Sequence, residues 1–427
     1  MQEQMKNLTQ FLQGALTPYH AQESARELLL NNGFTRLYET DDWNLCEGGK
    51  YFVEREGALL AFTVGAPDNF SYKIAASHLD SPALKLKENA EIKAGGCVTL
   101  NVETYGGGIW YSFFDRPLKI AGRVVKSENG RVYSETVTSP YFVTIPSVAI
   151  HQNRNANEGF SVNPQTDLLP IVGLDDTEYE NFLTEITSDG RVLAYDLFVV
   201  SATEPYFFGK NEEFLASPRV DNLTSVYASL EGLCAHANSD GVAIVALFNN
   251  EEIGSGTTSG AGGDFLEITM KRIAYALRFD ESEYFKALSS SFLLSVDNAH
   301  ALHPNHPEKS DPTNKVKAGG GVVIKSHANG AYITDATSCA IVKTIFEKAG
   351  VPYQTFFNRS DARSGSTLGK IALQRTHMKG ADIGLAQYAM HSACESFAVS
   401  DYLEMVNAIT AFFSSDLRAE EDGFIIR

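Results

Sequence analysis

The chain has 427 residues, of which 44% are hydrophobic and 21% are charged, and its formal net charge is −18 at pH 7. Nucleic-acid-binding proteins carry basic faces, so this acidic balance argues against nucleic acid as a partner. No apolar run reaches the roughly 18 residues that span a bilayer, and the first residues lack a signal-peptide core, so we expect no membrane segment. The five cysteines are odd in number and lack metal-ligand spacing. This predicts free thiols and a cytoplasmic location.

The length exceeds what one hydrophobic core usually supports, so we expect one large domain and a smaller second one. The first part of the chain has an α/β pattern. Pro18 suits the first position of a helix that ends at Asn32-Gly33. The runs 59–64 and 73–77 predict strands.

The pattern changes between residues 84 and 206. Short alternating runs are separated by turns there, and Asn129-Gly130 is a strong hairpin signal. Helical periodicity is largely missing from this region. We therefore predict that residues 84–206 form an inserted, mainly β domain, and that residues 1–83 and 207–427 form one α/β domain around it.

An α/β pattern resumes after Pro218. The predicted elements are a helix from Leu223 to Cys234, strands at 243–248 and 292–296, and helices near 337–349 and 401–413. Strands that alternate with helices predict a mixed or parallel sheet with helices on both faces. Sites in such sheets lie at the carboxyl ends of the strands.

Two adjacent carboxylates, Glu251 and Glu252, follow the apolar run 243–247. A buried charge without a partner destabilises a protein by several kcal/mol, so a buried strand that ends in two carboxylates indicates a positive partner. A metal cation is the simplest such partner. Adjacent residues can also divide the work, one as a metal ligand and the other as a proton carrier.

Further acidic and histidine side chains occupy similar places. His78 and Asp80 follow the predicted strand 73–77, and their two-residue spacing points both side chains to the same side of an extended chain. This suits a ligating histidine whose other ring nitrogen is held by a carboxylate, although Asp80 can also act on its own. The remaining candidates are Asp221 at a helix start, Asp297 after the strand 292–296, and His391.

Each candidate also has an ordinary structural explanation. Asp221 alone suits a helix N-cap. His391 alone suits a structural histidine, and Glu251 with Glu252 suits a solvated strand end. The stretch from His300 to His306 fits a metal-binding tract and a proline-containing loop equally well. The conjunction of five candidate positions at strand ends or helix starts favours the metal site.

Several motifs together resemble the M18 aminopeptidases, the aspartyl aminopeptidase group. The matching stretches occur in order and are Ser77–Pro82, Gly106–Trp110, Phe114–Arg116, Ser217–Asn222, Asn250–Ser255, Asp297–Asn305, the loop 359–367, and Met390–Ser392. The resemblance implies a zinc-peptidase-like catalytic domain over residues 1–83 and 207–427, with a mixed sheet flanked by helices. It also implies that the inserted β domain, residues 84–206, serves dimerisation and oligomerisation.

The resemblance implies a metal-ligand set. One zinc ion would be held by His78, Asp221 and Asp297. The other would be held by Asp221, Glu252 and His391, so that Asp221 bridges two ions in each subunit. Manganese or cobalt stays open in place of zinc.

The resemblance also implies catalytic and substrate-binding roles. Glu251 matches the family's general base, Asp80 matches the carboxylate behind the first histidine, and His300 is similar to a histidine near the scissile carbonyl. Lys325 matches a lysine associated with an acidic substrate side chain; from its spacing alone it suits a solvated surface lysine. His151 resembles a histidine that a neighbouring subunit supplies from its inserted domain; alone it suits a structural histidine.

The expected function is a cytoplasmic di-zinc aminopeptidase that removes N-terminal residues from peptides, with a preference for Asp and Glu. The family's tetrahedral dodecamer, built from dimers, is the expected homo-oligomer. The loop 359–367 departs from eukaryotic members at Ala362-Arg363-Ser364. A broad or neutral aminopeptidase, or an N-deacylase on the same metal pair, therefore stays an alternative. A binding or scaffold protein on a decayed peptidase fold is a further alternative, which the intact ligand set disfavours.

Overall fold

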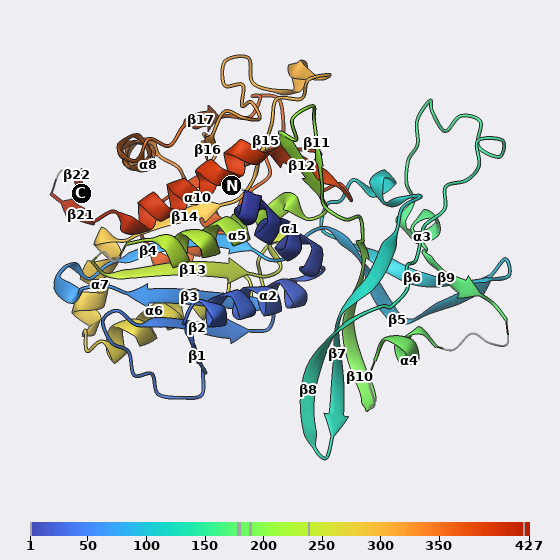
Figure 1. Cartoon of the computed structure of the whole chain (residues 1–427), viewed down its shortest axis with the longest axis horizontal. Helices are drawn as coiled ribbons and strands as arrows, with labels where there is room; N and C mark the ends of the chain where they lie inside the picture. The colour runs from blue at the N-terminus through green and yellow to red at the C-terminus, as the bar shows by residue number, and fades with distance from the viewer. Residues whose placement is uncertain (1, 177–180, 188–189, 238–239, 422) are drawn as a thin grey trace.

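The computed structural model describes residues 2–176, 181–187, 190–237, 240–421 and 423–427. The chain forms a large α/β body and a second sheet that projects from one side of it (Figure 1). In the part of the chain described, the helices are too short or too polar to span a bilayer.

A nine-stranded mixed sheet is the centre of the α/β body. Its inner strands are buried along their whole length, because helices cover both faces. The neighbours β13, β4, β14 and β18 run parallel, so their carboxyl ends meet at one edge. In spatial order the strands are β1 (Thr35–Leu37), β2 (Lys50–Arg55), β3 (Ala58–Val64), β13 (Val242–Phe248), β4 (Tyr72–His78), β14 (Phe292–Val296), β18 (Lys379–Gly384), β16 (Val322–Lys325) and β17 (Tyr353–Phe356).

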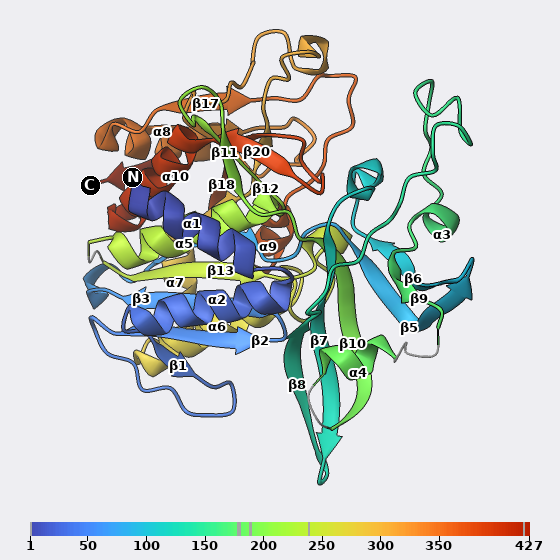
Figure 2. The ribbon, with the colours of Figure 1, turned by 45° about the vertical axis from the view of Figure 1, so that its right-hand side comes forward.

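Two layers of helices enclose this sheet, and each layer packs with one sheet face into its own apolar core (Figure 2). The first layer contains α1 (Gln2–Gly14), α2 (Pro18–Asn31), α5 (Val220–Ala235), α8 (Ala336–Ala349) and α10 (Val399–Ser414). The second contains α6 (Phe265–Ala276), α7 (Glu281–Ser290) and α9 (Leu368–Thr376). The expected mixed sheet with helices on both faces is confirmed.

A smaller five-stranded sheet lies beside the carboxyl edge of the main one. It contains, in order, β11 (Tyr206–Phe208), β12 (Phe214–Ser217), β20 (Glu395–Ala398), β19 (Ala386–Tyr388) and β15 (Ala299–His300). Its strands come from distant parts of the chain, so it brings residues near 217, 300 and 391 to one place. The chain ends in a hairpin, β21 (Leu417–Glu420) and β22 (Gly423–Ile426).

The projecting sheet has six strands and an apolar core of its own. In order they are β8 (Arg131–Thr138), β7 (Leu118–Glu128), β10 (Arg191–Ser201), β5 (Ala83–Ala94), β6 (Cys97–Tyr105) and β9 (Ile171–Leu174). The predicted hairpin joins β7 to β8 through Asn129 (φ 50°) and Gly130 (φ 81°), the left-handed conformation that such two-residue turns require. Two short helices, α3 (Pro164–Asp167) and α4 (Phe182–Ile186), flank this sheet. The boundaries 84–206 stay a prediction.

The structure also contains elements that the sequence did not predict. The helix α1 occupies a stretch that mixes polar and apolar residues, and it buries Met5, Leu8, Phe11 and Leu12. The helices α6, α7 and α9 and the strands β1 and β2 were likewise not predicted. Four 3-10 turns complete the described elements: η1 (Pro67–Asn69), η2 (Trp110–Phe113), η3 (Glu251–Ile253) and η4 (Pro307–Lys309).

Candidate metal centre

Three parallel strands of the main sheet deliver candidate residues to one edge. His78 is the last residue of β4. Glu251 and Glu252 open η3, which begins three residues beyond the end of β13, and Asp297 directly follows β14. Because these strands are neighbours in the sheet, side chains that are up to 219 positions apart in the sequence lie close together.

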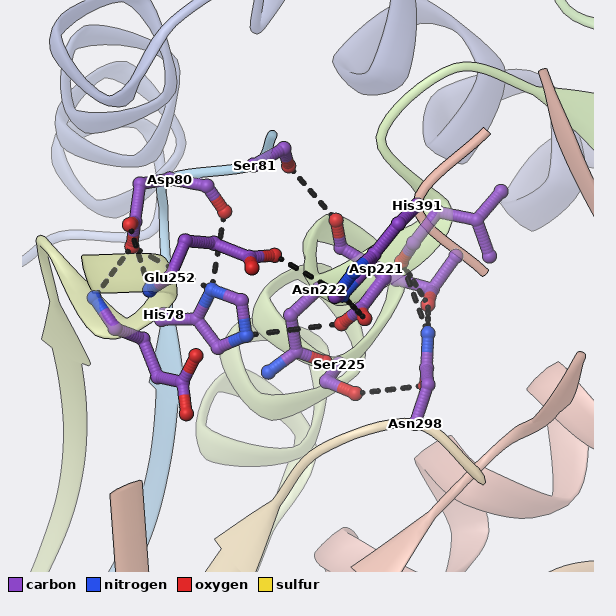
Figure 3. A network of polar contacts seen from close by, with 12 residues as sticks. His78, Asp80, Ser81, Asp221, Asn222, Ser225, Glu252, Asn298 and His391 are labelled. Carbon is purple, nitrogen blue, oxygen red and sulfur yellow. Dashed lines mark hydrogen bonds and ion pairs between the residues drawn. The ribbon is translucent and has the colours of Figure 1, made fainter. Parts of the chain in front are cut away.

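The small sheet supplies the remaining candidates. Asp221 follows β12 in the first turn of α5, and His391 lies between β19 and β20. Figure 3 shows the side chains of Asp221 and His391 facing His78 and Glu252. The peptide bond from Asp221 to Asn222 is cis.

The five candidates form two triads that share Asp221. One contains His78 and Asp297 and the other contains Glu252 and His391, and in each the possible ligand atoms lie within 4.8 Å of one another. His391 Nε2 is 3.3 Å from both Asp221 Oδ2 and Glu252 Oε1. His78 Nε2 is 3.6 Å from Asp221 Oδ1. Among the residues that the structure describes, these are the only such groups, so the stretch from His300 to His306 does not form one.

The chemistry of this cluster fits divalent cations. Asp221 Oδ1 and Glu252 Oε1 are buried and have no hydrogen-bond partner among the described residues. A buried carboxylate oxygen without a donor is costly, and a cation satisfies it. Imidazole nitrogens and carboxylate oxygens are donors that zinc accepts, and manganese and cobalt accept them too. The residues present therefore fit the metal that the sequence implies.

The electrostatics of the cluster show an excess of negative charge. Burial and the neighbouring carboxylates raise the pKa of Glu251 to about 8, with His78 acting in the opposite direction. Burial likewise raises the pKa of Glu252 well above its ordinary value and raises that of Asp297. Burial disfavours the charge of His391, but the hydrogen bond to Asp221 and the charge of Glu252 outweigh it and raise its pKa to about 10. These groups of the folded chain therefore bind protons more tightly than the same side chains do in water.

Asp80 fixes the orientation of His78. The Nδ1 atom of His78 donates to the backbone carbonyl of Asp80 at 3.0 Å and lies 3.5 Å from Asp80 Oδ1. Since Nδ1 carries the proton, Nε2 is free to face Asp221 and a metal. Asp80 is completely buried. Its carboxylate also accepts the backbone N–H groups of Glu251 and Glu252, each at 3.1 Å.

Glu395 is a site residue to which the sequence gave no role. Its buried carboxylate accepts the backbone N–H of Asp221 at 3.0 Å and that of His391 at 2.5 Å. The hydroxyl of Ser81 donates to the carbonyl of Asp221 at 2.7 Å from the other side. Glu395 thus holds the backbone of both Asp221 and His391, and the φ of 68° at His391 is rare for a residue with a side chain. The only sequence signal was a glutamate at the start of a buried strand.

Two ordinary explanations of the candidates do not apply. The N-cap of α5 is Arg219, and the side chain of Asp221 faces the two histidines instead. Glu252 is not solvated, because its side chain is only 5% exposed. Glu251 belongs to neither triad and is held through its backbone, so its carboxylate is left for another task.

His300 lies beside the cluster on the short strand β15. It lines a cavity of about 370 Å³ together with His303, Tyr388 and Arg359, the first residue of the loop 359–367. Burial, and then the charge of Lys325, lower the pKa of His300, which favours the neutral ring. A cavity of this size has room for part of a peptide.

Lys325 is buried and not solvated, with only 2% of its surface exposed. Its ammonium donates to the carbonyl of Asn298 at 3.1 Å and lies 5.0 Å from the ring centre of Tyr332. Burial opposes its charge, but the charges of Asp297 and its other neighbours outweigh burial and raise its pKa. Lys325 therefore stays cationic close to one triad.

His151 is exposed in a turn of the long connection between β8 and α3. Within the described residues it makes no hydrogen bond or ion pair with the candidate ligands of its own chain. It is also not a buried structural histidine at a strand end. Its surface is available to another molecule.

Comparisons with known proteins identify the family of the chain. The family model "Aminopeptidase I zinc metalloprotease (M18)" matches residues 11–413. A protein of Clostridium acetobutylicum named "Probable M18 family aminopeptidase 2" is 38% identical over 425 residues, which cover 96% of this chain and 98% of that protein. The motif resemblance is thereby confirmed.

Solved structures show the same fold. A chain in the cryo-EM structure of the Ape4 and Nbr1 complex superposes with a TM-score of 0.92 at 32% identity, covering 97% of this chain and 86% of that one. The structure of the S. cerevisiae mApe1 dodecamer superposes with a TM-score of 0.79 at 26% identity, covering 96% and 95%. With a family match along most of its length and relatives of this identity, the chain belongs to the M18 family of zinc metallo-aminopeptidases and is a hydrolase.

Proposed function

We propose that this hydrolase removes N-terminal residues from peptides with two metal ions in each chain. His78, Asp221 and Asp297 would hold one ion, and Asp221, Glu252 and His391 the other. The observation that carries this proposal is the pair of triads joined by one carboxylate, with two buried carboxylate oxygens that lack a hydrogen-bond partner among the described residues. Zinc is the resident metal proposed, in keeping with the family description, and manganese or cobalt fits the same donors.

A pair of divalent cations at such a site lowers the pKa of water, polarises a carbonyl and can bind a free amine. The residues of the chain then have separate tasks. Glu251 would accept a proton from the attacking water and deliver it to the leaving amine, because its carboxylate lies outside both triads. Asp80 would hold His78 and the backbone of Glu251 in place, and His300 would approach the scissile carbonyl from its cavity.

We infer a preference for acidic N-terminal residues, with Lys325 as the positive partner of their side chain. Support comes from a buried, charged ammonium near the triads in a protein whose net charge is −18. A broad or neutral specificity, or N-deacylation, stays the alternative, because Lys325 already donates to the carbonyl of Asn298. A panel of aminoacyl-nitroanilides and N-acyl amino acids, assayed with defined metals, separates these functions.

The central experiment is removal and return of metal. Chelation should abolish hydrolysis of aminoacyl-nitroanilides, and added zinc, manganese or cobalt should restore it. Metal analysis of the active enzyme should find about two ions in each chain. Full activity in thoroughly metal-free protein would refute the two-metal proposal. Absence of activity with every metal would instead favour the decayed-fold alternative, which peptide binding then tests.

We also propose that residues 84–206 are the oligomerisation domain of a tetrahedral dodecamer built from dimers. Support comes from the separate core of this sheet, from the exposed His151, and from a relative whose structure is a dodecamer. His151 would reach the site of a neighbouring subunit. The five free cysteines support a cytoplasmic location.

Mixing two inactive variants tests this arrangement. His151→Ala and Glu251→Gln should each be inactive alone. After subunit exchange, some sites combine Glu251 from one chain with His151 from another, so activity should reappear. Light scattering and labelled subunits verify exchange. Proven exchange without recovered activity would show that His151 does not act in the site of a neighbouring chain.

A further inference from the structure

The last residue of β6 joins the projecting sheet to the candidate metal centre. Tyr105 is 8% exposed, and its hydroxyl donates to Asp80 Oδ2 at 2.8 Å. The same hydroxyl accepts a hydrogen bond from Asn250 Nδ2 at 2.9 Å. Asn250 in turn accepts a hydrogen bond from Thr257 through its Oδ1, at 2.9 Å. A continuous line of donors therefore runs from the loop after η3, through Tyr105, to the carboxylate of Asp80.

The carboxylate of Asp80 connects Tyr105 to the two glutamates of the site. Its Oδ2 accepts from both Tyr105 and the backbone N–H of Glu252, and its Oδ1 accepts from the backbone N–H of Glu251. Without the hydroxyl of Tyr105, Oδ2 would lose its shortest donor, and the carboxylate could rotate. Because the two glutamates are held by their backbone, a rotation of Asp80 would shift both of them and the ring of His78 together.

The residues after Tyr105 contact the other side of the centre. His391 Nδ1 donates to the carbonyl of Gly107 at 2.9 Å, and the backbone N–H of Ile109 donates to the carbonyl of His391 at 2.9 Å. A Cβ atom at Gly106 would lie 3.1 Å from Cβ of Glu252, so the backbone passes very close to that ligand. One segment of the projecting sheet thus touches residues of both sides of the cluster.

We propose that Tyr105 is a positioning residue, which acts through Asp80 to hold Glu251, Glu252 and His78 in place. The proposal rests on the proposed two-metal function. It links the projecting sheet directly to the alignment of the general base. Groups that support metal ligands in this way typically change metal affinity or activity by about 10–100-fold when they are removed. Small displacements of a base from its productive position also lower turnover steeply.

The variant that tests this is Tyr105→Phe. Phenylalanine keeps the ring that packs edge-on against Phe198, with ring centres 5.4 Å apart, and removes only the hydroxyl. We expect kcat to fall by about 10–100-fold with KM changed less than about twofold. Zinc affinity, measured by competition with a chromophoric chelator, should fall by about tenfold. The matched control is Tyr195→Phe, which removes a phenol hydroxyl of the same sheet that donates to the carbonyl of Lys87 at 2.6 Å, and which should change neither quantity.

A double-mutant cycle separates positioning from general destabilisation. If Tyr105 acts through Asp80, adding Tyr105→Phe to Asp80→Asn should reduce kcat by less than about twofold further. Phe198→Leu, which disturbs the ring packing and keeps the hydroxyl, should lower the melting temperature and leave zinc affinity unchanged.

Wild-type kcat and zinc affinity in folded Tyr105→Phe would overturn the proposal. So would full additivity with Asp80→Asn, or a Phe198→Leu variant that loses zinc affinity as Tyr105→Phe does. The proposed function fails differently, because the wild-type enzyme would then keep its activity after its metal has been removed.

Discussion

Two clusters of charge in this protein are built in opposite ways. Around Asp196, in β10, the chain supplies its own cations. Lys85 donates to one carboxylate oxygen at 2.8 Å, and Arg123 donates to the other at 3.0 Å. At the candidate metal centre, Asp221 and Glu252 face histidines, and each keeps one buried oxygen without a hydrogen-bond partner among the described residues.

The pKa values of Asp196 and Glu252 follow this difference, whereas at Asp221 burial is outweighed by the histidines and Lys325, which lower its pKa. Burial opposes the charge of Asp196, but the hydrogen bonds and charges of Lys85 and Arg123 outweigh burial and hold its pKa below the ordinary value. Burial raises the pKa of Glu252 far above its ordinary value, and His391 does not compensate. We call the Asp196 cluster complete, because side chains of the protein balance its negative charge. We call the cluster at the candidate metal centre incomplete, because a cation from outside the chain is needed to balance its buried carboxylates. The buried carboxylate oxygens without a hydrogen-bond partner among the described residues, more than the gathering of acids, therefore mark the candidate metal centre.

Removing the shared carboxylate should have the largest effect. Asp221→Asn deletes the group common to both triads, so activity should fall by on the order of a thousandfold or more. Metal content, measured by mass spectrometry after dialysis, should fall from about two ions to less than one in each chain. Asp196→Asn is the matched control and should keep its metal. Full metal content in the Asp221 variant would contradict the comparison between the two clusters.

Substitutions of the two adjacent glutamates in the candidate metal centre should have different effects. Glu251→Gln keeps the shape of the side chain and loses the proton acceptor, so kcat should fall by on the order of a hundredfold or more with metal content and folding intact. Glu252→Gln should instead weaken metal binding, because this carboxylate belongs to a triad. Steady-state kinetics and metal titration on both variants check the division. Reversed phenotypes would show that the roles of these neighbours are exchanged.

Substitution of a lysine beside each cluster should affect substrate specificity differently. Lys325→Ala should lower kcat/KM by about tenfold for Asp and Glu substrates and leave Ala and Leu substrates nearly unchanged, because it removes the cation that would meet a substrate carboxylate. Lys85→Ala, in the complete cluster, should not alter the ratio between acidic and neutral substrates. An equal loss on all substrates would remove Lys325 from the specificity pocket.

The sequence predicted those parts of the fold and site that depend on local pattern. Buried parallel strands appear as continuous apolar runs, so β4, β13 and β14 were found, and the rule that sites lie at the carboxyl ends of strands directed attention to His78, Glu252 and Asp297. The helix α1 was missed because its few apolar residues lie in a polar stretch. Its stability comes from packing against the rest of the body.

Asp80 was predicted as a supporting residue from its spacing to His78, but Glu395 and Tyr105 could not be predicted, because their roles depend on how separate elements pack. Glu395 accepts the backbone N–H of Asp221 across 174 positions of sequence. Tyr105 meets Asp80 only because the projecting sheet is seated against the main one at this point. In each case the contact depends on how separate elements pack together, which no local pattern of the sequence encodes.

The smallest effect is expected from Asp196→Asn, which removes the charge of the complete cluster. The folded-state pKa of Asp196 lies below the unfolded-state value of about 4. The unfolded chain therefore binds more protons at this group between the two pKa values. Its stabilising contribution is present above the unfolded pKa and is lost as pH falls through the folded pKa.

At pH 7 the Asn variant should be less stable than wild type by about 1 kcal/mol, a value that allows for solvent screening because Asp196 is partly exposed. The difference should shrink as pH falls from about 4 through the lower folded-state pKa, because the unfolded chain takes up the proton first and folded Asp196 takes it up at lower pH. Urea unfolding of metal-free protein, followed by circular dichroism at several pH values, measures both quantities. A difference that grew on acidification would mean that Asp196 is not held charged by Lys85 and Arg123. A loss of bound metal in this variant at pH 7 would mean that the two clusters are not independent.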